Sequence, residues 1–226
     1  MLYAGMNRND GIQPFLAPGT AALDPHNGKF ISQVYRCVDR AANQVLSRLQ
    51  ADDGIVPSCH PGCCACCKQH ILATAVEARA LTEYIRRQFS AGQLRMLKER
   101  TRRWLSWDRL RLQPSAAAFS QWGDEAAGHP ACPLLVDGIC SVYPMRPMTC
   151  RTHFVSTPPS YCRHDNDPQT SGNSPLSLSE VVRAAAPFSA MIRDRIEAGG
   201  GDYLKSIMLL PHWLPIEMGW ELAPAA

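Results

Sequence analysis

Ten cysteines in a chain of 226 residues are the feature of this sequence that points to chemistry. Thiolates are preferred ligands of zinc, copper(I) and iron–sulfur clusters. In a chain without an export signal, crowded cysteines more often bind metal or do redox chemistry than form structural disulfides. Nine of the ten fall into two groups, which leaves Cys37 apart. The groups are Cys59, Cys63, Cys64, Cys66 and Cys67, and then Cys132, Cys140, Cys150 and Cys162.

The first group has the short spacing of a metal-binding loop. Pro61-Gly62 favours a tight turn that lets the sulfurs of Cys59 and Cys63 face one point. The Cys63-x2-Cys66 step lets a loop offer two thiolates to one ion. Zinc sites and iron–sulfur clusters each take four ligands. We therefore expect the two groups, about 65 residues apart, to converge on a metal and to close the intervening helices into one unit.

Two other interpretations account for the cysteines less well. A disulfide framework is disfavoured because adjacent cysteines such as Cys66 and Cys67 resist bridging to each other. Buried thiols that act as small apolar side chains account for Cys37 and for Cys64, but not for so many clustered cysteines. Metal binding by most of the two groups is the prediction.

Two segments of the chain resemble the YkgJ-like cysteine-cluster family, whose members are described as zinc- or iron-chelating domains. Residues 59–67, CHPGCCACC, resemble the family's CxxCxxCC signature, with Cys64 where a small residue is usual. Residues 132–151, CPLLVDGICSVYPMRPMTCR, resemble its second block, in which a CP step, a GC step and an RPxxCR end follow in order. The resemblance covers roughly residues 55–165, about half of the chain.

The resemblance implies more ligands than one tetrahedral site can use. Two ions, a cluster with an ion, or additional thiols that do not bind metal all remain open. Zinc and an iron–sulfur cluster also remain open, although the Cys66-Cys67 pair and the Cys132-Pro133 step lean towards iron. A related cluster occurs in flagellin lysine methylases, an analogy that does not assign methylation here. The implied ligands are Cys59, Cys63, Cys66, Cys67, Cys132, Cys140 and Cys150, with Cys162 as a further candidate.

Two arginines flank the thiols of the second block. The guanidinium groups of Arg146 and Arg151 are expected to offset the charge of a thiolate site and to donate hydrogen bonds to sulfur. The alternative for Arg146 is an ion pair with a surface carboxylate. Histidines near the cysteines are expected to be bystanders, since thiols are abundant. His153, three residues after Cys150, is the first of them to test.

Helical periodicity dominates the rest of the chain. We expect helices over residues 30–49, 74–89, 90–114, 115–128 and 177–198, and a last short helix before an apolar tail. Sequences typical of capping boxes open three of them, at Thr74–Glu77, Ser90–Gln93 and Ser177–Glu180. The predicted fold is mainly α-helical with little β structure, and two cysteine-bearing loops meet at a metal site.

The predicted organisation is one metal-binding domain. Residues 1–23 form an extended arm without periodicity, and residues 24–226 form the domain. Within the domain, a cysteine-cluster core spans about residues 55–165, a long loop covers 155–178, and a helical extension covers 177–226. The start of the chain has no basic and apolar leader, and no stretch approaches the roughly 20 apolar residues of a membrane span. We expect a cytoplasmic protein without a membrane partner.

The net charge and the charged segments limit the kinds of partner and of function that we expect for the chain. The net charge of +3 is too weak to require a nucleic acid. A basic helix at 91–111 and the apolar C-terminal tail are candidate surfaces for a protein partner, although a basic helix is more often a solvated face. The predicted function is metal binding. The alternatives are a redox or protein-modifying enzyme that depends on an iron–sulfur cluster or metal, and metal delivery; no catalytic group is identified.

Overall fold

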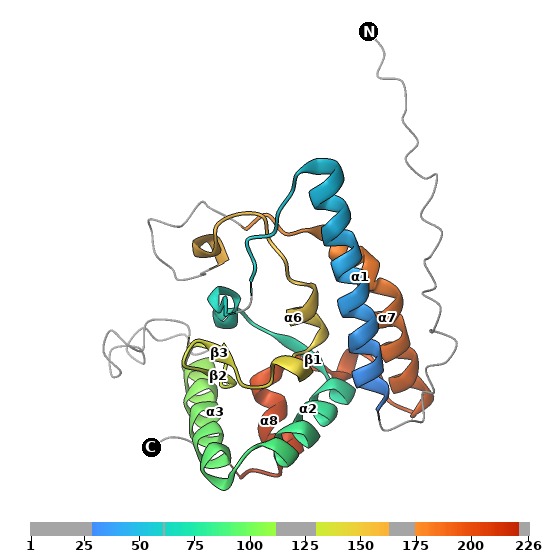
Figure 1. The fold of residues 1–226 in the computed structure, drawn as a ribbon. Coiled ribbons are helices and arrows are strands. Elements are labelled where there is room, and N and C mark those ends of the chain that lie inside the picture. Colours follow the sequence, from blue (N-terminus) through green and yellow to red (C-terminus); the bar gives the residue numbers. More distant parts are fainter. Residues whose placement is uncertain (1–28, 61, 112–129, 163–174, 222–226) are drawn as a thin grey trace.

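The computed structural model describes residues 29–60, 62–111, 130–162 and 175–221. Its elements are mostly helices, which confirms the predicted mainly α-helical class. The arm at 1–23 and the helix expected at 115–128 lie outside the described residues. Among those described, the β structure consists of two small antiparallel sheets, β1 with β4 and β2 with β3. Figure 1 shows the helices around a centre to which the cysteine-bearing segments contribute.

The longest helices, α1 (Phe30–Asp53) and α7 (Ser179–Ala198), pack side by side (Figure 1). Each contributes an apolar stripe at helical spacing, which is buried when the two faces meet. Val34 and Val38 of α1 and Phe188 and Ile192 of α7 belong to the same buried core. Helix α1 ends at Gly54, whose φ of 65° is in the left-handed region that glycine adopts without strain.

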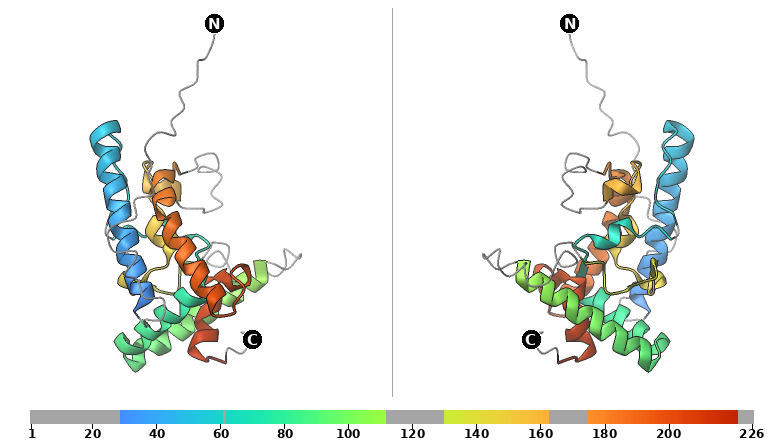
Figure 2. Two further views of the ribbon diagram at one scale, coloured as in Figure 1. Left: turned by 90° about the vertical axis from the view of Figure 1, so that its right-hand side faces the viewer. Right: turned by 90° about the vertical axis from the view of Figure 1, so that its left-hand side faces the viewer.

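Helices α2 (Ala75–Gln88) and α3 (Ala91–Arg111) cross below this pair (Figure 2). The capping boxes predicted for these two helices are present. Thr74 accepts from the backbone of Glu77 while Glu77 accepts from the backbone of Thr74, and Ser90 and Gln93 exchange the same two bonds. Each reciprocal pair satisfies amides that the first turn of a helix leaves free.

The C-terminal segment belongs to the same core as the cysteine-bearing half. Strand β4 (Ile207–Leu209) pairs with β1 (Leu72–Thr74), and α8 (Leu210–Met218) packs on α2 and α3. Leu210 and Leu214 are fully buried. The apolar side chains expected to be offered to a partner are therefore mostly used inside the chain, although Ile216 stays exposed.

The start of α7 differs from the prediction. The helix begins at Ser179 after Leu178, and no side chain caps it. Ser177, the expected cap, instead forms an antiparallel bridge with Val155. This bridge holds the backbone of Ser177 extended, which explains why a locally suitable capping sequence is not used. Helix α7 continues through Pro187 to Ala198.

Of the helices in the described ranges, none combines the length and the apolar character needed to cross a bilayer.

Candidate metal centre

The two cysteine groups meet in the folded chain. The backbone N–H of Cys132 donates to the carbonyl of Cys67 at 2.7 Å, which ties the start of the second group to the end of the first. A cavity of about 100 Å³ opens beside this contact, well above the roughly 10–15 Å³ that a cavity needs to hold one water. Leu134, Val142 and Leu210 supply part of its apolar lining. The cysteines that line it are Cys63, Cys66, Cys67, Cys132, Cys140 and Cys150.

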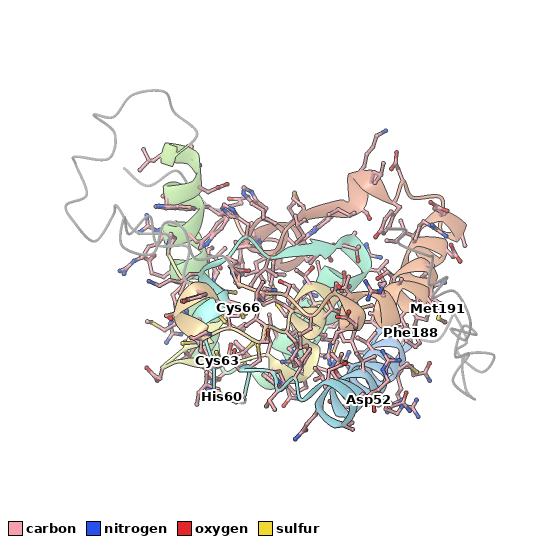
Figure 3. All side chains as sticks on the ribbon, turned by 90° about the horizontal axis from the view of Figure 1, so that it is seen from above. Asp52, His60, Cys63, Cys66, Phe188 and Met191 are labelled. Carbon is pink, nitrogen blue, oxygen red and sulfur yellow. The ribbon has the colours of Figure 1, made fainter. Side chains whose placement is uncertain are left out.

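Tight turns position the first group. Gly62 has a φ of 88°, and the N–H of Cys63 donates to the carbonyl of His60, which closes the expected turn. A 3-10 helix over Ala65–Lys68 follows and carries Cys66 and Cys67. Figure 3 shows His60, Cys63 and Cys66 close together, on the opposite side of the molecule from Phe188 and Met191 of α7. Cys63 lines the cavity, and its neighbour Cys64 does not.

A hairpin and a short helix position the second group. Strands β2 (Leu135–Val136) and β3 (Ile139–Cys140) pair across Asp137-Gly138, whose φ angles of 49° and 77° are typical of a type I′ turn. Cys140 therefore sits beside Leu135 in the ladder. Helix α6 (Met148–Thr152) carries Cys150 towards the same cavity.

Cys162 approaches the first group from another direction. It lies in a 3-10 helix over Pro159–Cys162 and is buried in a small cluster with Ala65 and Val155. Cys59 and Cys63 pack against this cluster. The side-chain amide of Gln69 donates to the carbonyl of Cys162 at 3.2 Å, which holds the two 3-10 helices together.

The thiols have strongly altered acidity. A hydrogen bond from the Cys67 thiol lowers the pKa of Cys66 to about 7, and the same bond raises the pKa of Cys67. Loss of hydration raises the pKa of Cys132 to about 12 and that of Cys162 to about 11. Burial also raises the pKa of Cys150 well above its ordinary value. Thiolates in this cluster therefore need a positive charge beside them.

Arg146 places a positive charge beside the cysteine sulfurs. It lines the cavity. Burial raises the pKa values of Cys59 and Cys140, and the positive charge of Arg146 offsets part of that rise. The same charge adds to the hydrogen bond from Cys67 that lowers the pKa of Cys66. Its guanidinium lies 4.1 Å from the centre of the Tyr143 ring. Its buried Nε has no hydrogen-bond partner among the described residues. An orphaned donor in a wall of thiols fits the predicted bond to a thiolate sulfur.

Arg151 occupies a different position. It is 3% exposed and does not line the cavity. Its guanidinium donates to Asp39 of α1 at 2.6 Å, to the carbonyl of Arg146 at 2.9 Å and to the carbonyl of Pro144. It also stacks 4.0 Å above the ring of Tyr35. These contacts hold α6, and with it Cys150, against α1.

Arg151→Lys is expected to lower the free energy of unfolding of the metal-free chain by about 2 kcal/mol. A lysine cannot make the forked bonds to two backbone carbonyls and a carboxylate, and buried acceptors are left unpaired. Urea unfolding under reducing conditions measures the loss. Arg193→Lys, on the exposed face of α7, is the matched control and should change stability by less than about 0.5 kcal/mol. Equal stability of the two variants would contradict this role.

The donor set fits a soft metal. Within the described part of the chain the cavity lining contains six cysteines and no acidic residue, as thiolate chemistry requires. The sulfurs line the cavity but do not point at one common position. Over the same residues, no three side chains of His, Cys, Asp or Glu already have the arrangement of a metal site. Binding would therefore need a deprotonation of thiols and a change of side-chain rotamers.

Cys37 and His153 are not among the predicted metal ligands. Cys37 is buried in α1, does not line the cavity, and accepts a hydrogen bond from Arg40 at 3.3 Å. The backbone carbonyl of His153 lies 3.9 Å from the sulfur of Cys59, close to the first group. That the imidazole of His153 is a bystander stays a prediction.

Sequence reasoning missed two features that build the site. Asp137-Gly138 is a strong hairpin signal, and a search for that dipeptide would have found β2 and β3. Glu77 was assigned only to a capping box, but it also accepts from the N–H of Met148 at 2.7 Å and so fixes the start of α6. No sequence pattern near Glu77 predicts its contact with Met148, which is 71 residues away.

Comparisons of the chain with protein-family models, with curated proteins and with solved structures find no match. The resemblance to the cysteine-cluster family therefore depends on the two cysteine blocks, and the function is argued from the site itself.

The thiol pKa values predict that the metal-free chain loses stability in alkali. A folded-state pKa of about 11 or 12, against the ordinary 9.0, means that the unfolded chain releases these protons first. Stability from such groups is present below pH 9 and falls as the pH rises towards 11–12. The lowered pKa of Cys66 has the opposite effect on stability, but Cys66 is a single group and the thiols with a raised pKa are several. Urea unfolding at pH 8 and pH 10.5 with reductant tests this, and Cys162→Ala should show a smaller loss.

Proposed function

We propose that this protein binds zinc or an iron–sulfur cluster through its clustered cysteines. The observation that carries the proposal is the meeting of two cysteine groups, distant in sequence, around one cavity. Gathering this many partly buried thiols, several beside one another, brings no evident advantage to a core that has ample leucine and valine. A metal that accepts thiolates explains why the chain assembles them.

The chemistry of the cavity supports this function. The cysteines supply soft ligands, Arg146 supplies compensating charge, and apolar side chains make up much of the remaining lining. Bound metal would supply folding free energy, because the ligands come from segments that only the folded chain brings together. The candidate ligands are Cys59, Cys63, Cys66, Cys67, Cys132, Cys140, Cys150 and Cys162.

We infer a reducing compartment, and by preference the cytoplasm. All ten cysteines, each of them within the described residues, are free thiols. Adjacent thiols such as Cys66 and Cys67, whose sulfurs share a hydrogen bond, would be open to oxidation outside a reducing environment.

A second candidate function is an enzyme that depends on the metal or cluster. The cavity reaches the surface at Ile139 and Tyr143, which are 64% and 46% exposed. These side chains and Arg146 would face a molecule that enters beside the sulfurs. A centre with an open coordination position would favour this candidate over a purely structural metal.

A protein partner on α3 has less support. Arg102 and Arg103 both pair with Glu99, and Arg100 donates to the carbonyl of Pro133 at 2.7 Å. Trp104 is buried. Arginines that are already bound within the chain favour a solvated helix face over a docking surface for an acidic partner.

Anaerobic purification followed by elemental analysis and absorption spectroscopy tests the proposal. A coloured protein with stoichiometric iron and acid-labile sulfide would identify an iron–sulfur cluster. A colourless protein with stoichiometric zinc would identify a zinc site. A chain that holds neither metal, and that acquires none on reconstitution with zinc or with iron and sulfide, would contradict metal binding.

A further inference from the structure

The candidate ligands lie in two different packing environments. Cys132, Cys140 and Cys150 pack against the main hydrophobic core of the molecule. Cys59, Cys63 and Cys162 belong to a separate small cluster built on Ala65 and Val155. Eight thiols are also twice the number that one tetrahedral ion or one four-thiolate cluster takes.

Backbone contacts hold the separate cluster together independently of the main core. Ser58 donates from its N–H to the carbonyl of Val155 at 2.9 Å and from its hydroxyl to the carbonyl of Thr157 at 2.5 Å. Gln69 binds the carbonyl of Cys162 from the other side. The segments before Cys59 and after Cys66 are thus fastened to the segment that ends at Cys162.

Cys67 completes the group formed by Cys132, Cys140 and Cys150, which pack against the main core. The Cys67 carbonyl accepts from the N–H of Cys132, and the sulfur-bearing residues Cys67, Cys132, Cys140 and Cys150 all line the cavity. Cys67 comes from the first 3-10 helix, Cys140 from the hairpin and Cys150 from α6, so three elements and the segment at Cys132 assemble this group. It reaches four thiols without Cys66.

Cys66 stands at the boundary between the two groups. Successive side chains of a 3-10 helix point about 120° apart, so Cys66 and Cys67 face different directions although their sulfurs share a hydrogen bond. The Cys63-x2-Cys66 spacing pairs Cys66 with Cys63. Cys63 and Cys66 also line the cavity, and the two groups therefore adjoin.

We infer that the chain holds two adjoining four-thiolate centres, one formed by Cys59, Cys63, Cys66 and Cys162, the other by Cys67, Cys132, Cys140 and Cys150. The inference rests on the proposed function and adds to it the number of centres and the ligands of each. The first centre joins the two 3-10 helices, and the second joins the hairpin and α6 to the first cysteine segment.

Titration of the full-length, metal-free chain with Co²⁺ under anaerobic reducing conditions tests the division. Tetrahedral thiolate-bound Co²⁺ absorbs strongly in the visible range, and its intensity reports how many sites are filled. We expect about two equivalents bound by the unaltered chain. Cys162→Ser and Cys150→Ser should each bind about one, because each removes one ligand from a different centre. The double variant should bind almost none.

Two controls separate loss of a site from loss of the fold. Cys64→Ser, in the same segment but not lining the cavity, should keep both equivalents. Far-ultraviolet circular dichroism should show native helix content in every variant that is compared. Should Cys162→Ser unfold, Cys59→Ser removes a ligand of the same centre from a half-exposed position.

The outcomes distinguish this inference from the function on which it rests. About one equivalent in the unaltered chain, or the same complete loss of Co²⁺ in both single variants, would mean one shared centre and would overturn the division while metal binding stands. An unaltered chain that binds no Co²⁺, no zinc and no iron on reconstitution with iron and sulfide would overturn the proposed function itself.

Discussion

Glu77→Ala is expected to cost about 4 kcal/mol of unfolding free energy, a large part of the 5–15 kcal/mol typical of a domain. Glu77 is 3% exposed, and its carboxylate accepts four hydrogen bonds. Two come from the N–H and hydroxyl of Thr74, one from the Tyr35 hydroxyl at 3.0 Å and one from the N–H of Met148 at 2.7 Å. Alanine would leave all four donors without this acceptor, three of them buried and the Met148 N–H partly buried.

The effect should extend from the fold to the metal centre. Met148 is the first residue of α6, which carries Cys150, so loss of the Glu77 carboxylate frees the element that delivers this thiol. We expect weaker Co²⁺ binding together with the lower stability. Urea unfolding of the metal-free chain and Co²⁺ titration measure the two effects.

Glu83→Ala is the matched control for Glu77→Ala. Glu83 lies in the same helix, but it is half-exposed and its carboxylate pairs only with Arg87 one turn later. Such surface pairs contribute a few tenths of a kcal/mol. If Glu77→Ala were as mild as Glu83→Ala, the carboxylate would not be the junction of α1, α2 and α6 that we describe.

Cys66→Ser is expected to lower metal affinity by more than about 100-fold, since changes to residues behind the ligands alone cost 10- to 100-fold. Cys66 lies at the boundary of the two cysteine groups, and its pKa of about 7 makes it the thiol most readily ionised near neutral pH. At saturating metal, a 100-fold loss corresponds to about 2.7 kcal/mol of stability. Metal content and thermal unfolding of the loaded chain are measured together.

Cys37→Ser provides the contrast. Cys37 is buried in α1 and lies apart from the cavity, so the serine hydroxyl costs some packing but removes no ligand. Metal content should match that of the unaltered chain. Equal metal content in Cys66→Ser and Cys37→Ser would contradict the ligand assignment, whatever their stabilities.

Local patterns determined the helices and the identity of the reactive side chains. The apolar spacing in α1 and the capping boxes at Thr74 and Ser90 are contained within a few neighbouring residues, and the folded chain uses them as expected. The same holds for the turn at Gly62. Where a distant segment competed, the local pattern failed, as when Val155 engaged Ser177 and left α7 without a side-chain cap.

The amino-acid sequence by itself determined a helical chain with two groups of soft ligands and a flanking pair of arginines. Only the tertiary structure decided that Arg146 faces the sulfurs whereas Arg151 braces α6 against α1. It also decided that Leu72–Thr74 pairs with Ile207–Leu209, that Glu77 fixes α6, and that the cysteines divide between two environments. The reason is that helix periodicity and caps act over one or two turns, whereas these contacts join segments whose proximity depends on the packing of the whole core.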